Sequence, residues 1–254
     1  MRRELLKAAD SLGIRPGLAR ARDGLVAALT GGNANALHRR NHLDDAHLKL
    51  LLSFLLAPES SCLDVGAHKG IFLTHFVRLA PRGHHIAYEP LPHLAAELAE
   101  RFPSIEVRRA ALSDHEGEST FVHVKDQPAY SGLRRGTSTD GHDTESIDVT
   151  TERLDDHVPP GWLPTFVKID VEGAEGLVLS GAMDTLRRAR PVLAFEHGWG
   201  GGEAHGVTDD DMYRMVCGDI GLRLFDLDGG GPLDRSQFRD ALASGHRWNW
   251  VAHP

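Results

Sequence analysis

Two patterns of apolar positions divide the chain near residue 58. Residues 1–57 place apolar side chains at helical spacing, as at Leu48 and Leu52. From Ser61 onward, short apolar runs of strand length alternate with helical segments. This alternation is typical of a mainly parallel sheet with crossover helices. We therefore expect a helical extension over 1–57 and an α/β domain over 58–254.

The same pattern predicts the individual elements of the α/β domain. Expected strands lie at 62–65, 84–89, 105–112, 165–171, 190–196, 222–228 and 248–253. Expected helices lie at 70–79, 91–102, 174–189 and 208–220, the last with Thr208 as its N-cap and a glycine after it. Residues 113–151 interrupt the rhythm with two alternating segments and a turn-rich loop over 126–145, of a kind that is functional or mobile in compact domains.

Charge and cysteine content narrow the class of protein. The net charge of −8 argues against a surface built mainly for nucleic acid or anionic lipid. Two separate cysteines, Cys62 and Cys217, make no disulfide framework and suit a reducing compartment. We find no secretory signal, and the apolar run from Leu48 to Pro58 is too short to span a bilayer. A cytoplasmic protein is expected, and the oligomeric state stays open, with a homodimer as one alternative.

Candidate chemistry begins with the stretch CLDVGAHKGIFL. A strand that ends in Asp64, followed by Gly66 and Gly70, brings backbone close to a ligand at the carboxyl edge of a parallel sheet. The next strand ends in Glu89, which suits the two hydroxyls of a ribose. A dinucleotide site favours G-x-G-x-x-G, whereas His68 replaces the second glycine here. The acid at 64 suits the ammonium of a methionine moiety better than a pyrophosphate, which indicates S-adenosylmethionine. The alternative is a turn in which Asp64 bonds its own backbone.

Seven motifs in order resemble those of one enzyme family. They are DVGAHKG, AYEP, AALSDHEGESTF, VTTERLDD, VKIDVEGAEGLVLSGA, RPVLAFE and LFDLDG, of which KIDVEGAE is the most specific. Together they resemble the FkbM family of S-adenosylmethionine-dependent O-methyltransferases over residues 62–254. The resemblance implies a Rossmann-like class I methyltransferase fold, α/β, with a mainly parallel seven-stranded sheet flanked by helices, here after the N-terminal helical extension.

The resemblance also implies a cofactor site, residue by residue. Asp64 and the glycine loop would line the methionine end, Glu89 would hold the ribose, and the stretch after the third strand would contact adenine. The full implied set is Asp64, Gly66, Ala67, His68, Gly70, Glu89, Pro90, Ser113, Asp114 and Asp170. Asp114 is an equally plausible turn residue.

Methyl transfer to a hydroxyl needs a group that takes or screens the proton. Candidates at the carboxyl ends of the fourth and fifth strands are Asp170, Glu196 and His197, and His142 lies in the long loop. Asp170 and Glu196 are also oxygen ligands suited to Mg²⁺. Plain alternatives are a helix cap for Asp170, a first-turn position for Glu172 and a solvated strand end for Glu196 and His197.

The expected function is methyl transfer to a hydroxyl of a sugar, oligosaccharide or polysaccharide precursor. The alternatives are a polyketide or other small natural product as acceptor, or cofactor binding without turnover. Methylation of a nucleobase is disfavoured because DVEG stands where amino-methylating DNA enzymes carry a D-P-P-Y-like segment. We therefore expect a small-molecule or saccharide acceptor, no nucleic acid and no membrane span. A nicotinamide dehydrogenase is the least favoured alternative, because the spacing of the glycines departs from G-x-G-x-x-G.

Overall fold

The computed structural model describes residues 34–124, 131–133, 143–198 and 205–254. The chain divides into two compact units, residues 1–46 and 47–254, and the strands all belong to the second. Helix α3 (Ala34–Leu55) is the helix described in the N-terminal region, where helices were expected.

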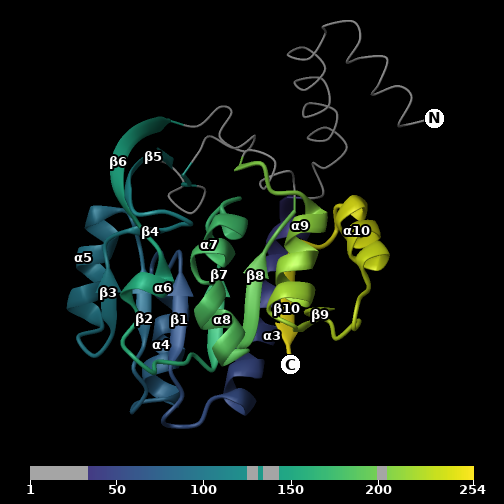
Figure 1. Cartoon of the computed structure of the whole chain (residues 1–254), viewed down its shortest axis with the longest axis horizontal. Coiled ribbons are helices and arrows are strands. Elements are labelled where there is room, and N and C mark those ends of the chain that lie inside the picture. The colour runs from purple at the N-terminus through teal and green to yellow at the C-terminus, as the bar shows by residue number, and fades with distance from the viewer. Residues whose placement is uncertain (1–33, 125–130, 134–142, 199–204) are drawn as a thin grey trace, which may run out of the picture. The chain divides into compact units, whose positions relative to one another are not determined.

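Seven strands of the described chain form one sheet in the order β3-β2-β1-β7-β8-β10-β9 (Figure 1). They are β1 (Cys62–Val65), β2 (Ile86–Tyr88), β3 (Glu106–Arg108), β7 (Phe166–Ile169), β8 (Val192–Glu196), β9 (Arg223–Asp226) and β10 (Asn249–His253). Pairing is parallel from β3 to β8, and β10 is antiparallel to both of its neighbours. The expected fold class, a mainly parallel seven-stranded α/β sheet, is confirmed.

The order of the strands determines where a ligand can bind. The first strand, β1, lies in the middle of the sheet, and β2 and β3 follow on one side of it. The chain then returns to the other side of β1, where it forms β7. The connections after β1 and β7 therefore leave a switch point between them. In open α/β sheets, ligands bind at the carboxyl ends of strands at such a point.

Helices cover both faces of the sheet. The second half of α3, α4 (Ile71–Leu79) and α5 (Pro92–Arg101) pack on one apolar cluster. The other cluster takes side chains from α6 (Leu154–His157), α7 (Glu175–Gly181), α8 (Met183–Ala189), α9 (Asp209–Tyr213), the π-helical turn η4 (Arg214–Asp219) and α10 (Arg235–Ser244). In Figure 1, α7, α8 and α9 lie in front of the sheet.

Alternation along β1 decides which face carries the polar chemistry. Leu63 and Val65 join the cluster under α7 and α8, whereas Cys62 joins the cluster under α4 and α5. Because side chains of a strand alternate between faces, Asp64 points to the same side as Cys62. A carboxylate is thereby buried at the α4 side of the central strand.

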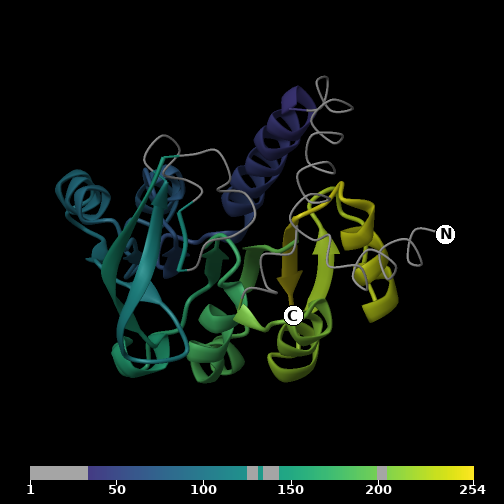
Figure 2. The ribbon, with the colours of Figure 1, turned by 90° about the horizontal axis from the view of Figure 1, so that it is seen from above.

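The single expected strand at 105–112 is wrong as one element. Its first half is β3 of the main sheet, but Ala111–Leu112 forms β4, which pairs with β6 (Thr144–Glu152) in a separate sheet ordered β4-β6-β5. Strand β5 (Gly117–Val124) runs antiparallel to β6 along its full length. Figure 2 shows this small sheet standing beside the main one. The chain changes sheets at Arg109 and Ala110, a change that apolar alternation does not record.

The helices also differ from expectation, and the short helix α6 is one that was not expected. The expected helix at 174–189 is two short helices that meet at Ala182, and the one expected from Thr208 continues from α9 into η4. Thr208 is the N-cap, as expected, because its side chain accepts a hydrogen bond from the Asp211 amide. Helix α10 was not expected, although Asp234 and Gln237 form a capping box at its start.

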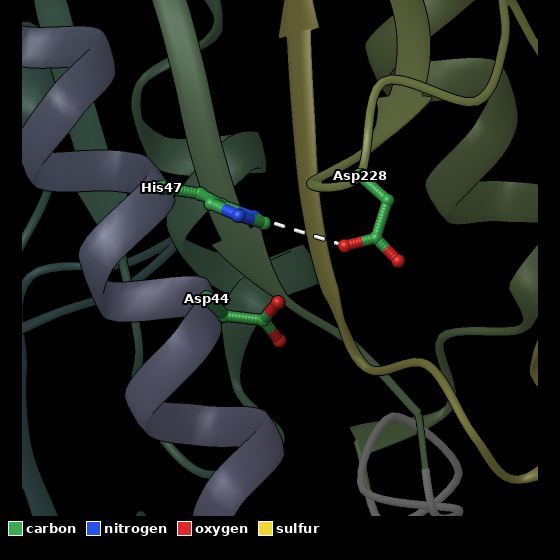
Figure 3. Close-up of side chains that lie close together, drawn as sticks. All are labelled: Asp44, His47 and Asp228. Carbon is green, nitrogen blue, oxygen red and sulfur yellow. Dashed lines mark ion pairs between the residues drawn. The ribbon is translucent and has the colours of Figure 1, made fainter.

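The second half of α3 packs on the main sheet, and one of its side chains approaches the turn after β9. Leu48 and Leu52 are buried in the cluster under α4, together with Leu227. His47 Nδ1 lies 3.7 Å from Asp228 Oδ1 in the turn that follows β9 (Figure 3). Within the described ranges, no helix combines the length and the apolar character that crossing a bilayer requires.

Gly181→Ala tests the packing of the small sheet on α7. A Cβ at 181 would lie 1.8 Å from the carbonyl oxygen of Ser113, backbone that has little room to move. We expect a loss of about 3 kcal/mol in the free energy of unfolding, measured by denaturant titration. Gly218→Ala is the matched control, because its Cβ meets only Arg214 Cγ at 3.7 Å, so it should be neutral or slightly stabilising. Equal midpoints for Gly181→Ala and wild type would contradict this packing.

Candidate active site

The loop after β1 is held close to β7 by glycines. Gly66 has a φ of 79°, and a Cβ there would lie 1.9 Å from the carbonyl oxygen of Asp170. Gly70 has a φ of 68°, and its Cβ would come within 2.7 Å of Leu98 and Phe102. Both positions therefore need glycine for conformation and for space. The result is a loop whose backbone lies directly against the start of the β7–α7 connection.

His68 lies between these glycines in a left-handed conformation, with φ 47°. Its backbone N donates to Glu89 Oε2 at 2.8 Å. Its Nε2 is buried without a hydrogen-bond partner among the described residues. Burial, and then the charge of Lys69, lowers the pKa of His68, so the ring is neutral at neutral pH. A neutral ring nitrogen in this position is available to a ligand.

Glu89 follows the end of β2 and is almost completely buried. Its two oxygens accept from the backbone N of His68 and of Leu91, the latter at 2.9 Å. Burial raises the pKa of Glu89 to about 7, although both N–H groups work in the opposite direction. Each carboxylate oxygen can accept a further hydrogen bond, so this rigid acid is suited to a pair of hydroxyls.

Lys168 lies between two acids of the site. The register of β1 and β7 puts Asp64 directly opposite Lys168, and the Nζ atom lies 3.8 Å from Asp64 Oδ1 and 3.0 Å from Asp170 Oδ2. Burial raises the pKa of Asp64 to about 6, with Lys168 opposing the rise. Burial alone would also raise the pKa of Asp170, but the Lys168 ammonium brings it below its usual range. Asp170 is therefore ionised at neutral pH.

Three carboxyl groups converge beyond this ion pair. Oxygens of Asp170, Glu172 and Glu196 all lie within 4.8 Å of one another. Burial, reinforced by the charge of Asp170, raises the pKa of Glu172 and of Glu196 well above 4.5. The Asp170 side chain is 37% exposed, so a molecule entering the site can reach it. Because the three groups lie so close together, the charge on each one affects the pKa of the other two.

The turn that carries Glu172 is strained. Its φ of 56° is unusual for a residue with a side chain, and such conformations persist at functional sites when the surroundings hold them. Glu175 holds the turn by accepting from the backbone N of Val171 at 3.3 Å and of Gly173 at 3.0 Å. Gly132 contacts it from the long loop, because a Cβ at 132 would lie 3.5 Å from Glu172 Cβ.

The structure thus brings together most of the expected site residues. Asp64, Gly66, Glu89, Asp170 and Glu196 gather at the carboxyl ends of β1, β2, β7 and β8. The two plain alternatives for the β7–α7 turn are wrong, because α7 begins at Glu175 with Ala174 as N-cap, so Asp170 and Glu172 both precede the helix. Pro90 is half-buried directly after Glu89.

Other expected residues lie in different surroundings. His197 is buried, and its Nε2 lies 2.9 Å from Asp209 Oδ1 at the start of α9, so its ring links β8 to that helix. Ser113 lies against Gly181 at the end of α7 opposite to Glu175, and Asp114 pairs with His115. Roles for these residues in catalysis or adenine binding stay predictions. His142 lies outside the described residues.

Sequence reasoning missed Lys168 and Glu175. A signal for Lys168 was present: it stands inside the apolar run TFVKIDV of a central strand. A lysine in a parallel strand that is covered on both faces requires a carboxylate partner. Asp64, in the other central strand, offered that carboxylate. Glu175 had no such signal, because an acid in the first turn of a helix is ordinary.

Comparison with known proteins finds one family and several relatives. The model of the methyltransferase FkbM domain matches residues 64–219, more than half of the chain. The AMB antimetabolite synthetase AmbE of Pseudomonas aeruginosa is 29% identical over 239 residues, covering 78% of this chain and 11% of that protein. The 2-O-methyltransferase NoeI of Sinorhizobium fredii is 28% identical over 159 residues, covering 55% of this chain and 64% of NoeI.

A solved methyltransferase FkbM from Methylobacillus flagellatus has a TM-score of 0.49 and 15% identity, covering 78% of this chain and 44% of that one. The chain therefore spans less than two thirds of the length of each relative described.

Asp64→Asn tests the buried carboxyl through the pH dependence of stability. Because the folded-state pKa of Asp64 is raised to about 6, the folded protein binds more protons than the unfolded chain between about pH 4 and 6. The wild type loses this contribution as the pH rises through that window, whereas asparagine has no proton to lose. We expect the stability of the ligand-free variant relative to wild type to increase by about 1 kcal/mol from pH 5 to pH 8, measured by denaturant titration.

Asp240→Asn, at an exposed helix position, is the control, and its difference from wild type should stay constant. A constant difference for Asp64→Asn as well would show that Asp64 is not buried as described.

Proposed function

Because this chain belongs to the FkbM methyltransferase family, we propose that it transfers a methyl group from S-adenosylmethionine to a hydroxyl oxygen of a sugar, oligosaccharide or polysaccharide precursor. The observation that carries the proposal is the arrangement of acids around the switch point: Asp64 and Glu89 on the cofactor side, Asp170, Glu172 and Glu196 beyond them. We propose that residues 58–254 form the methyltransferase domain. The name of NoeI, a 2-O-methyltransferase, supports oxygen as the acceptor atom.

A small natural product is the second candidate acceptor. AmbE, which is named a synthetase of an antimetabolite, aligns with 78% of this chain. The acidic net charge of −8 favours either class over nucleic acid.

The residues around the glycine loop suit S-adenosylmethionine. Asp64 offers a buried carboxylate to an ammonium, and Glu89 offers two held oxygens to the ribose hydroxyls. Gly66 and Gly70 let the backbone of the loop pack closely against Asp170 and against Leu98 and Phe102, and His68 presents a buried Nε2. The cofactor supplies a methyl group on a sulfonium, so the protein has mainly to align an acceptor oxygen behind it.

The carboxyl groups beyond the cofactor would handle the acceptor proton. Asp170 is ionised and partly exposed, so it accepts the hydrogen bond of the acceptor hydroxyl and orients it. Glu196, whose pKa is raised and which is hydrogen-bonded to Asp170, allows the pair to take up the hydroxyl proton. The acceptor oxygen would form the new C–O bond as the bond between the methyl carbon and sulfur breaks, with S-adenosylhomocysteine as the leaving group. We add Glu172 to this group, because its pKa is raised by the same neighbours.

Asp170 and Glu196 are also the residues expected to hold Mg²⁺. With Glu172 they offer oxygens, which are the donors that this ion prefers. These residues nevertheless do not fit Mg²⁺. Their oxygens are suitable donors, but the positively charged Lys168 ammonium already lies 3.0 Å from Asp170 Oδ2. We therefore derive no step through a metal.

Calorimetric titration with S-adenosylhomocysteine tests the cofactor site. Wild type should bind it, and Glu89→Ala should weaken binding by about 10- to 100-fold because two hydroxyls lose their acceptor. NAD should not bind. Glu100→Ala, at an exposed position of α5, is the matched control and should bind like wild type. Binding of NAD, or no binding of S-adenosylhomocysteine by wild type, would refute the assignment.

Glu196→Gln and Asp170→Asn test the proton-accepting pair. Turnover would be followed as transfer of a labelled methyl group to a panel of monosaccharides and short oligosaccharides. Each variant should lose about 100-fold in turnover, the usual size of a general-base contribution, while its affinity for S-adenosylhomocysteine stays within about 3-fold of wild type. Glu100→Gln is the control. Normal turnover in both variants would move the base elsewhere.

A further inference from the structure

Lys168 is the buried cation of the site, and in the steps proposed above it serves only to keep Asp170 ionised. It lies in the middle of β7, a central strand, where neighbouring positions are apolar and buried. Its side chain is only 12% exposed, and its Nζ lies 5.4 Å from the centre of the Phe72 ring in α4. Packing on both sides therefore fixes the position of the ammonium.

Several carboxyl groups surround the single positive charge of Lys168. Five acids interact electrostatically with this ammonium: Asp64, Glu89, Asp170, Glu172 and Glu196. Like charges at such distances repel strongly in a buried site unless a cation or a shared proton compensates them. A cluster of this composition would ordinarily recruit a divalent ion.

We propose that Lys168 is the resident cation of this cluster: it takes the place of a divalent metal at Asp170, and it links Asp170 to Asp64. The geometry supports this, because one ammonium lies 3.0 Å from Asp170 Oδ2 and 3.8 Å from Asp64 Oδ1. A metal ion bound to the same carboxylate would lie close to a fixed positive charge and would be repelled by it. Lys168 is thus a positioning residue that holds the two acids and keeps the site free of metal.

The position of Lys168 also connects the two halves of the site. Asp64 belongs to the side where the cofactor is proposed to bind, and Asp170 to the side of the acceptor. A charge shared by both acids keeps them at a constant separation across the β1–β7 pair. The mechanistic part of this inference rests on the proposed function, whereas the exclusion of metal does not.

Manganese binding is the test, measured by electron paramagnetic resonance and by calorimetry on the full chain. Wild type and Lys168→Arg should bind Mn²⁺ weakly, in the millimolar range. Lys168→Met, which keeps the length of the side chain and removes the charge, should bind Mn²⁺ at least about 10-fold more tightly. The double variant Lys168→Met with Glu196→Gln should lose that gain. A role in packing alone would not create a metal site.

Mn²⁺ should also raise the melting temperature of Lys168→Met and leave that of wild type unchanged. Tight Mn²⁺ binding by wild type, abolished by Glu196→Gln, would overturn the inference, as would a folded Lys168→Met that gains no affinity. If Lys168→Met folds neither with nor without Mn²⁺, the wild-type titration decides: wild type that binds no Mn²⁺ at a site removed by Glu196→Gln supports the inference, and Mn²⁺ bound at such a site overturns it. Failure of wild type to bind S-adenosylhomocysteine would count against the proposed function alone.

Discussion

The parallel pairing of β1 with β7 is the constraint on which the site depends. It puts Asp64 opposite Lys168, and two residues later it brings the carbonyl of Asp170 against Gly66. A shift of one residue would turn every side chain of the strand to the other face of the sheet. The polar groups would then enter the apolar cluster under α7 and α8. The packing of Leu63, Val65, Val167 and Ile169 in that cluster therefore also holds the ion pair in place.

The price of this arrangement is the burial of several carboxyl groups. The pKa values of Asp64, Glu89, Glu172 and Glu196 are all raised, which means that burial disfavours their charged forms in the folded protein. Strain at Glu172 adds to the cost. Groups perturbed together at the carboxyl edge of a sheet are typical of a functional site, because stability alone would favour apolar side chains there.

The small sheet β4-β6-β5 adds residues to the surroundings of the site that the main sheet does not supply. Strand β6 pairs with β4 on one side and with β5 on the other. Ser113, directly after β4, packs against Gly181, so the small sheet lies next to α7. Part of the long loop returns to this sheet: Gly132 pairs with Val122, and Leu133 is buried among Leu91, Phe121 and Ala174. Residues 131–133 therefore lie next to the turn that carries Glu172.

Local chemistry in the sequence determined much of this protein. Alternating apolar runs predicted the parallel sheet, Thr208 predicted the start of α9, and the stretches around Asp64 and Glu89 predicted that these acids lie at the ends of two strands, because these features depend on residues close in the chain. Only the tertiary structure decided that 105–112 belongs to two sheets, that Asp170 precedes the helix, and that Lys168 lies between two acids. Those outcomes depend on strand register and on burial, and both are set by contacts between residues far apart in the sequence.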